Sequence, residues 1–287
     1  MFVKDNTLAA AKAYFFERLP QFSESELRSM WWQIICKRFN WRKEDLLLNA
    51  HTRLSESDLL YVRSYVKRLQ ENEPFQYIIG ETTFLDVTIK CSPAALIPRP
   101  ETEELVAWIT EERKVERVVD ICSGTGCIAL GIKSFFKEST VTGVELSEDA
   151  IELSKENAKI NQLEVNFLRG DALNLSDSVW STFSNVSIVV SNPPYIPLSE
   201  KAEMDKNVLD FEPHLALFVP DNQAIIFYEK IAAIANLILK KEGSLYFELH
   251  PDFQVEVSEM LGEKGFGSIE IRQDLQGKNR MLKAIKL

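Results

Sequence analysis

From residue 115 to the end of the sequence, segments typical of buried strands alternate with segments typical of helices. We expect strands at 117–121, 140–145, 165–168, 186–190, 244–249, 269–271 and 281–285, and helices at 127–136, 147–161, 223–239 and 251–261. Parallel strands need long crossover connections, usually helices, so this alternation predicts a largely parallel, doubly wound α/β sheet. Ligands of such sheets bind beyond the carboxyl ends of the strands, which makes the residues that follow each strand the candidates for a functional site.

Residues 1–75 carry helical patterns only, and we expect four or five short helices that form a bundle. Ser23 followed by Glu26, and Ser55 followed by Asp58, are the spacings of capping boxes, in which each side chain caps the other's backbone N–H. The segment contains no catalytic constellation. A structural cap and a partner-docking domain both fit this pattern.

The next segment, residues 76–98, changes character. Residues 83–90 are close to strand alternation, and with 77–79 across Gly80 they predict a β-hairpin. The expected organisation is therefore a helical domain at 1–75, a hairpin linker at 76–98 and an α/β domain at 99–287.

Charge is unevenly distributed: residues 1–90 carry a net charge of +1 and residues 91–287 a net charge of −11. An acidic second part argues against nucleic acid as a partner, because phosphate backbones are bound by basic surfaces. The sequence has no apolar run of the roughly 18 residues that a membrane span needs, and its first residues do not resemble a signal peptide. The four cysteines show no Cys-x-x-Cys pair and the three histidines are scattered. We expect a cytoplasmic protein without a metal site or membrane contact.

A glycine-containing turn follows the strand at 117–121, which includes Asp120. Its residues are Cys122, Ser123, Gly124, Thr125 and Gly126. Glycines let a backbone approach a ligand closely, and the helix that follows presents unpaired N–H groups. A dinucleotide site would have Gly-x-Gly-x-x-Gly to hold a pyrophosphate, which is not the pattern here. The turn instead resembles the S-adenosylmethionine turn of seven-stranded methyltransferases.

Acidic residues end the next two strands. Glu145 is placed to accept hydrogen bonds from two ribose hydroxyls, and Asp171 follows the third strand. The glycine pair alone is a weak signal, but together with these two acids it indicates a nucleoside cofactor.

The apolar run 186–190 leads directly into Asn192, Pro193, Pro194 and Tyr195. Two consecutive prolines must end the strand, because neither donates a backbone N–H, and they hold Asn192 and Tyr195 on a stiff turn. The Oδ1 of Asn192 and the carbonyl of Pro193 are able to accept the two protons of a planar NH₂ group, while Tyr195 lies against that group. Catalysis would then come from positioning and oriented dipoles, without a strong general base.

The motif Asn-Pro-Pro-Tyr matches methyltransferases that act on planar nitrogens, a class that includes adenine in nucleic acids and glutamine in proteins. Further segments at 73–80, 96–103, 119–130, 191–197, 211–218 and 274–280 follow in an order seen in one family. Over essentially its full length the chain resembles the release-factor glutamine methyltransferases (HemK/PrmC type). The resemblance implies a class I S-adenosylmethionine-dependent (Rossmann-like) methyltransferase domain, preceded by a helical domain that docks the release factor. The implied acceptor is the glutamine of the Gly-Gly-Gln loop of bacterial class 1 release factors.

The resemblance also implies roles for individual residues. The cofactor, which would leave as S-adenosylhomocysteine, would be held by Asp120, Cys122, Ser123, Gly124, Thr125, Gly126, Glu145, Asp171, Ala172 and Asn192. The catalytic residues would be Asn192, Pro193 and Tyr195, and the acceptor would be bound by Asn192, Pro193, Pro194, Tyr195, Arg99 and Glu101. We expect a monomer.

Three positions depart from the family pattern. Cys122 replaces a glycine, Glu145 stands where aspartate is common, and Ala172 stands where an aromatic residue can flank the adenine. Two alternatives stay open at this point: an adenine-N6 methyltransferase that acts on DNA or RNA, and a non-catalytic binder that has kept the fold.

Overall fold

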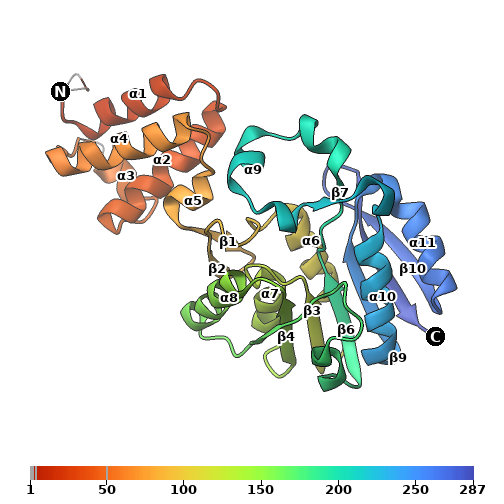
Figure 1. The fold of residues 1–287 in the computed structure, drawn as a ribbon. Coiled ribbons are helices and arrows are strands. Elements are labelled where there is room, and N and C mark those ends of the chain that lie inside the picture. Colours follow the sequence, from red (N-terminus) through yellow and green to blue (C-terminus); the bar gives the residue numbers. More distant parts are fainter. Residues whose placement is uncertain (1–2, 4, 50) are drawn as a thin grey trace. The chain divides into compact units, whose positions relative to one another are not determined.

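The computed structural model describes residues 3, 5–49 and 51–287. The chain forms two compact units, Met1–Ile79 and Gly80–Leu287, and Figure 1 shows the elements of both. Across the described ranges, none of the helices has the length and apolar character required to cross a membrane.

The first unit is helical, as the sequence predicts. Its helices are α1 (Leu8–Arg18), α2 (Glu24–Phe39), α3 (Asp45–Leu48), α4 (Glu56–Gln70) and α5 (Phe75–Ile79). Both predicted capping boxes are present, at the start of α2 and at the start of α4. A core of apolar side chains joins the helices, and within it the rings of Phe15 and Trp31 lie with their centroids 5.6 Å apart.

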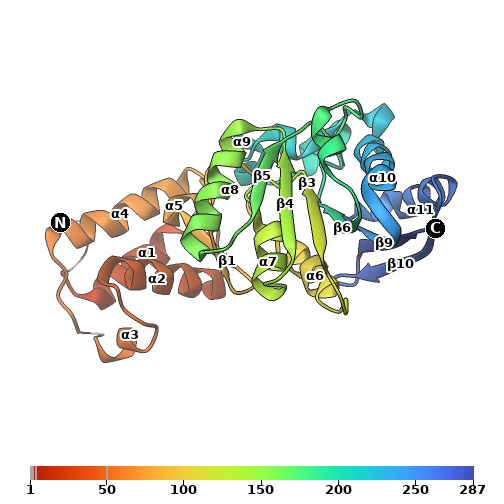
Figure 2. The same cartoon turned by 90° about the horizontal axis from the view of Figure 1, so that it is seen from below.

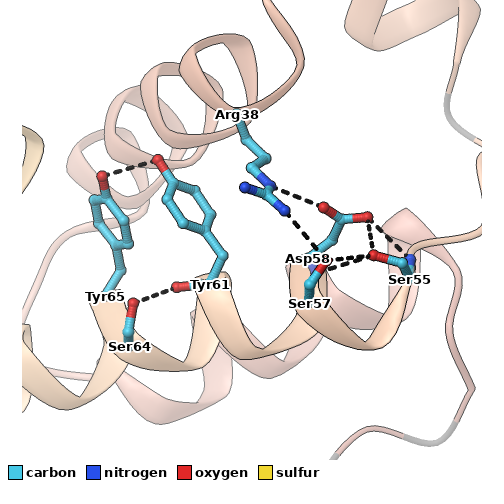
Figure 3. A network of polar contacts seen from close by, with 7 residues as sticks. All are labelled: Arg38, Ser55, Ser57, Asp58, Tyr61, Ser64 and Tyr65. Carbon is cyan, nitrogen blue, oxygen red and sulfur yellow. Dashed lines mark hydrogen bonds and ion pairs between the residues drawn. The ribbon is translucent and has the colours of Figure 1, made fainter.

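A polar contact joins the end of α2 to the start of α4 (Figure 3). Arg38 donates to Asp58 over 2.8 Å and lies over the ring of Tyr61, 5.1 Å from its centroid. Asp58 also accepts the backbone N–H of Ser55 over 3.0 Å, so one carboxylate both caps α4 and pairs with α2. Partial burial alone would raise the pKa of Asp58, but the hydrogen bonds from Ser55 and Arg38 hold this pKa below its ordinary value.

The strand predicted at 77–79 is wrong, because these residues form the last turn of α5. The N–H groups of Tyr77 and Ile78 donate to the carbonyl of Pro74, over 3.0 and 3.1 Å. Gly80 follows with φ of +85°, so the short helix begins after a proline and ends at a glycine. The hairpin consists instead of β1 (Glu81–Phe84) and β2 (Val87–Lys90), which pair antiparallel within the second unit.

A seven-stranded sheet organises the second unit, in agreement with the predicted fold class. Its strands are β3 (Arg117–Ile121), β4 (Thr140–Glu145), β5 (Asn166–Arg169), β6 (Val186–Ser191), β9 (Leu239–Glu248), β10 (Phe266–Gln273) and β11 (Asn279–Lys286). The order across the sheet is β10-β11-β9-β6-β3-β4-β5. β11 runs opposite to the other six strands, which are parallel to one another. A separate pair, β7 (Ile196–Pro197) and β8 (Phe218–Val219), lies beyond the end of β6.

Helices cover both faces of this sheet (Figures 1 and 2). On one face α6 (Pro100–Ile109), α7 (Cys127–Phe135) and α8 (Glu148–Asn161) contribute to an apolar core. On the other face α10 (Ile226–Ile238) and α11 (Gln254–Glu263) contribute to a second core. The short helix α9 (Lys206–Phe211) belongs to the segment that connects β7 and β8.

The chain leaves the centre of the sheet in both directions, and this fixes where a ligand can bind. From β3 it proceeds through β4 to β5 on one side, and β6 begins the strands on the other side. Ile121, the last residue of β3, pairs with both Val144 and Ser191. The loops after β3 and β6 diverge at this point, which is where doubly wound sheets bind their ligands.

Candidate active site

A cleft opens at this switch point, and most of the predicted site residues line it. The lining includes Arg99, Cys122, Ser123, Gly124, Thr125, Glu145, Asp171, Ala172, Asn192 and Pro194. These residues follow the carboxyl ends of four neighbouring parallel strands or precede α6. Five predicted residues do not line the cleft: Asp120, Gly126, Pro193, Tyr195 and Glu101.

The turn after β3 has a backbone that favours glycine at several positions. Gly124 and Gly126 have φ of +54° and +79°, and Cys122 has φ of 62° although it carries a side chain. At Gly126 an added Cβ would lie 2.8 Å from Cζ of Phe167 and 3.1 Å from Cβ of Ser154, so the turn is also closely packed. Cys122 therefore occupies a conformation that disfavours side chains.

Glu145, at the end of β4, holds this turn in place. Its Oε2 accepts the backbone N–H of Gly124 over 2.9 Å. Its Oε1 accepts the N–H groups of Leu146 and Ser147 over 2.8 and 2.9 Å. The acid expected to face a ribose thus also connects the glycine turn to the loop after β4.

Asp120 lies behind the turn, completely buried. Its Oδ2 accepts the hydroxyl of Ser123 over 2.8 Å, while its Oδ1 has no hydrogen-bond partner among the described residues. Burial, with a smaller contribution from the negative charge of Glu145, raises the pKa of Asp120 to about 7.

The raised pKa of Asp120 predicts a specific pH dependence of stability. Between the ordinary value of 3.8 and a value of about 7, the folded protein retains a proton that the unfolded chain has released. The contribution of Asp120 to the free energy of unfolding therefore falls as pH rises through this range. In Asp120→Asn this contribution is absent, so the melting temperature of the variant relative to wild type should increase from pH 4 to pH 7. If the melting temperatures of the two proteins instead change by the same amount between pH 4 and pH 7, the raised pKa is not that of Asp120.

Asn192 follows β6 and has a defined partner. Its Nδ2 donates to the Oγ1 of Thr102 over 3.1 Å, and Thr102 in turn donates to the Oε2 of Glu248 over 2.6 Å. Tyr195 donates its hydroxyl to the Oε1 of the same carboxylate over 2.9 Å. The motif is thus linked by side-chain hydrogen bonds to α6 and to the end of β9.

Tyr195 lines a second hollow. Residues of this hollow include Glu200, His250, Lys278 and Arg280. The ring of Tyr195 also packs edge-on to that of His250, with 5.9 Å between centroids. The Asn-Pro-Pro-Tyr segment therefore contributes to two hollows, Asn192 and Pro194 to the first and Tyr195 to the second.

Arg99 and Glu101, both predicted to bind the acceptor, differ in position. Arg99 lines the cleft and donates to Glu212 over 2.6 Å. Glu212 is buried and also accepts the N–H of Ile97 over 3.1 Å, so it fixes the segment before α6. Glu101 lines neither hollow, and its Oε1 lies 3.5 Å from Nε2 of Gln276.

The sequence interpretation missed three residues of this site: Thr102, Glu212 and Glu248. Glu248 had a detectable signal, because it ends an apolar strand just as Glu145 does. Thr102 and Glu212 had none, since their roles depend on partners 146 and 115 residues away.

Comparison with known proteins agrees with this geometry. Residues 100–210 match the methyltransferase small domain, and residues 10–80 match the PrmC N-terminal domain. A release factor glutamine methyltransferase of Flavobacterium psychrophilum is 36% identical, over 91% of this chain and 93% of the relative. One of Bacteroides thetaiotaomicron is 34% identical over 92% and 94%. The chain belongs to the release factor glutamine methyltransferase family.

Solved structures support the fold of this family member. The 16S rRNA N2 G1207 methyltransferase of Thermus thermophilus, solved with AdoMet and guanosine, has a TM-score of 0.52 at 18% identity, covering 72% of this chain and 50% of that one. A methyltransferase from Pyrococcus furiosus has a TM-score of 0.51 at 16% identity, covering 77% and 96%. At these identities the likeness concerns the fold alone, and it confirms the methyltransferase architecture.

Proposed function

We propose that this protein transfers a methyl group from S-adenosylmethionine to the side-chain nitrogen of the glutamine in the Gly-Gly-Gln motif of bacterial class 1 release factors. One observation carries the proposal: Asn192 of the Asn-Pro-Pro-Tyr motif lines the same cleft as the glycine turn and Glu145. Donor and acceptor groups would therefore meet at Asn192. Membership of the release factor glutamine methyltransferase family supports the choice of acceptor.

The residues of the cleft fit the proposed cofactor. Glu145 supplies a carboxylate for the ribose, and the small side chain of Ala172 with its neighbour Leu173 offers apolar surface for the adenine. Residues 122–125 of the glycine turn line the cleft and would border the methionine part, while Asp120 lies buried behind this turn. When bound, the cofactor supplies a methyl group on a sulfonium, which leaves a neutral thioether after transfer.

The chain's own residues would supply position and polarity. An amide nitrogen is a weak nucleophile because its lone pair is delocalised, so its NH₂ group must be held with the lone pair aimed at the methyl carbon. The Oδ1 of Asn192 and the carbonyl of Pro193 would accept hydrogen bonds from its two N–H groups. As the N–C bond forms and the S–C bond breaks, the nitrogen gains positive charge and then releases one proton to water. Tyr195 lies on the second hollow, which favours an acceptor that arrives from that side.

The test is incubation of the purified protein with S-adenosylmethionine and an unmodified release factor, followed by mass spectrometry of the peptide that contains Gly-Gly-Gln. The expected result is a gain of one methyl group on the glutamine, and no gain in a release factor whose glutamine is replaced by alanine. Parallel reactions contain DNA and RNA with accessible adenines. Methylation of adenine with an unmodified release factor would overturn the proposal in favour of the nucleic acid alternative.

We further propose that residues 1–79 dock the release factor. Removal of this unit should raise the KM for the release factor by at least about tenfold, since a second binding module adds effective concentration. Cofactor affinity should change by less than about twofold, because the cleft is built within the second unit. Titration calorimetry with each ligand separates these effects, and an unchanged release-factor affinity would count against the docking role.

Two expectations complete this assignment. Because release factors act in translation termination, we propose that the protein works in the cytoplasm. We also propose that it acts as a monomer on the class 1 release factors.

A further inference from the structure

Behind Asn192 lies a chain of side-chain hydrogen bonds that neither the family motif nor the proposed cofactor site accounts for. It runs from Asn192 to Thr102 on α6 and on to Glu248 at the end of β9. Thr102 is 2% exposed and Glu248 is 1% exposed. Thr102 lines the cleft but Glu248 does not, so Glu248 acts on the site through the residues that it binds.

The chain has a direction, which follows from the donors and acceptors that each group possesses. An ionised carboxylate only accepts hydrogen bonds, and a threonine hydroxyl has one proton to donate. Since Thr102 gives its proton to Glu248 over 2.6 Å, it offers a lone pair to Asn192. Asn192 must then turn its NH₂ group toward Thr102, over 3.1 Å, which leaves Oδ1 on the opposite side of the amide. The reversed amide would face Thr102 with an oxygen, and Thr102 would have to abandon Glu248.

A buried carboxylate is costly, and this cost argues that Glu248 has a specific role. The side-chain hydrogen bonds it accepts come from two neutral hydroxyls, those of Thr102 and Tyr195. The neighbouring cation, Arg280, donates to the carbonyl of Leu249 and lies 3.6 Å from Asp274. Burial raises the pKa of Glu248, against the hydrogen bonds from Thr102 and Tyr195. An apolar side chain of similar volume at this position would avoid this penalty.

We propose that Thr102 and Glu248 are positioning residues that fix the orientation of the Asn192 amide, so that Oδ1 rather than Nδ2 faces the NH₂ group of the methyl acceptor. The same carboxylate accepts a hydrogen bond from the hydroxyl of Tyr195. One buried group therefore fixes both polar side chains of the Asn-Pro-Pro-Tyr motif, Tyr195 directly and Asn192 through Thr102. This inference rests on the proposed glutamine methylation. It adds two residues that orient the motif: Thr102, which lines the cleft and binds Asn192, and Glu248, which does not line the cleft.

The test compares two substitutions of Thr102 of nearly equal size. Thr102→Val removes the hydroxyl and retains the shape, whereas Thr102→Ser retains the hydroxyl. With a saturating release factor, Thr102→Val should lower kcat by about tenfold or more, with cofactor affinity within about twofold of wild type. Thr102→Ser should keep kcat within about threefold of wild type. Glu248→Gln, which is unable to accept both hydroxyl protons, should behave like Thr102→Val.

A second measurement does not depend on methyl transfer. The side-chain amide protons of Asn192, assigned by NMR from the signal lost in Asn192→Asp, should exchange with solvent at least about tenfold faster in Thr102→Val than in wild type. Wild-type kcat and unchanged exchange in Thr102→Val would overturn the proposal, as would equal losses of kcat in the valine and serine variants. If the wild-type protein leaves the release factor unmodified, the proposed function fails, and the exchange rates alone decide whether Thr102 orients Asn192.

Discussion

Methyl transfer to the release factor should fall by about 10³-fold or more when Asn192 is replaced by alanine, while cofactor affinity changes by less than about fivefold. Asn192 lines the cleft and its amide is held by a hydrogen bond to Thr102, so its loss removes an oriented acceptor at the proposed point of reaction. Single-turnover rates with labelled cofactor and titration calorimetry measure the two quantities separately.

A matched control is available in the same unit. Asn166 is exposed and is the first residue of β5. It lies at the amino end of this strand, whereas the cleft is lined by residues at the carboxyl end. Asn166→Ala should therefore retain wild-type rates. Near-normal transfer by Asn192→Ala would refute the role assigned to this side chain, because the Asn-Pro-Pro-Tyr motif has no other side-chain amide to replace it.

Replacing Gly126 by alanine should weaken cofactor binding by at least about tenfold, because two costs combine at this position. Its φ of +79° disfavours a side chain, and the new Cβ would lie 2.8 Å from Cζ of Phe167. Phe167 is buried in the core between the sheet and its helices and has little room to withdraw. The turn at 122–126 must therefore move, and it forms part of the cleft wall. Calorimetric titration with S-adenosylmethionine measures the loss.

Gly265 provides the control that separates conformational strain from crowding. It has φ of +83°, but an added Cβ there meets no atom within 4 Å. Gly265→Ala should lower the melting temperature slightly and leave cofactor affinity unchanged. If Gly126→Ala binds the cofactor as tightly as Gly265→Ala does, the turn at 122–126 does not form part of the cofactor site.

The strands at 117–121 and 140–145 were predicted with their observed bounds. Both are short, apolar and β-branched, and a tight turn ends the first of them. The helix-to-strand boundary near 239 was less well placed, since β9 begins at Leu239 instead of at residue 244. Lys240, Lys241 and Glu242 at its start resemble a solvent-exposed loop or helix end, so local pattern alone did not reveal the strand.

The error at 77–79 has a different physical origin. Three apolar residues fit a strand and a helical turn equally well, and periodicity does not separate the two over so short a length. The preceding Pro74 and the following Gly80 were the better guide, because proline starts helices and glycine ends them. Reading Gly80 as a hairpin turn assigned the wrong meaning to its positive φ.

The sequence predicts site residues that follow a strand, but it does not predict contacts between residues far apart in the chain. Residues that follow a strand were found, because the end of a strand is visible in a few neighbouring positions. The pairing of Thr102 with Glu248 crosses 146 residues and becomes visible only when α6 and β9 are placed side by side. Tyr195 was expected to hold the acceptor together with Asn192, but it lines a separate hollow.

The three backbone amides bound by Glu145 have a consequence for how ligands are distinguished. One carboxylate oxygen already accepts two hydrogen bonds and the other accepts one, which leaves a single free lone pair. A sugar that approaches this side chain therefore finds one vacant acceptor, and a second bond requires displacing an amide from the surrounding loops. The preference for ribose over its deoxy analogues would then depend on the free energy needed to break one of these backbone hydrogen bonds. Aspartate, which is one methylene shorter, would change that free energy.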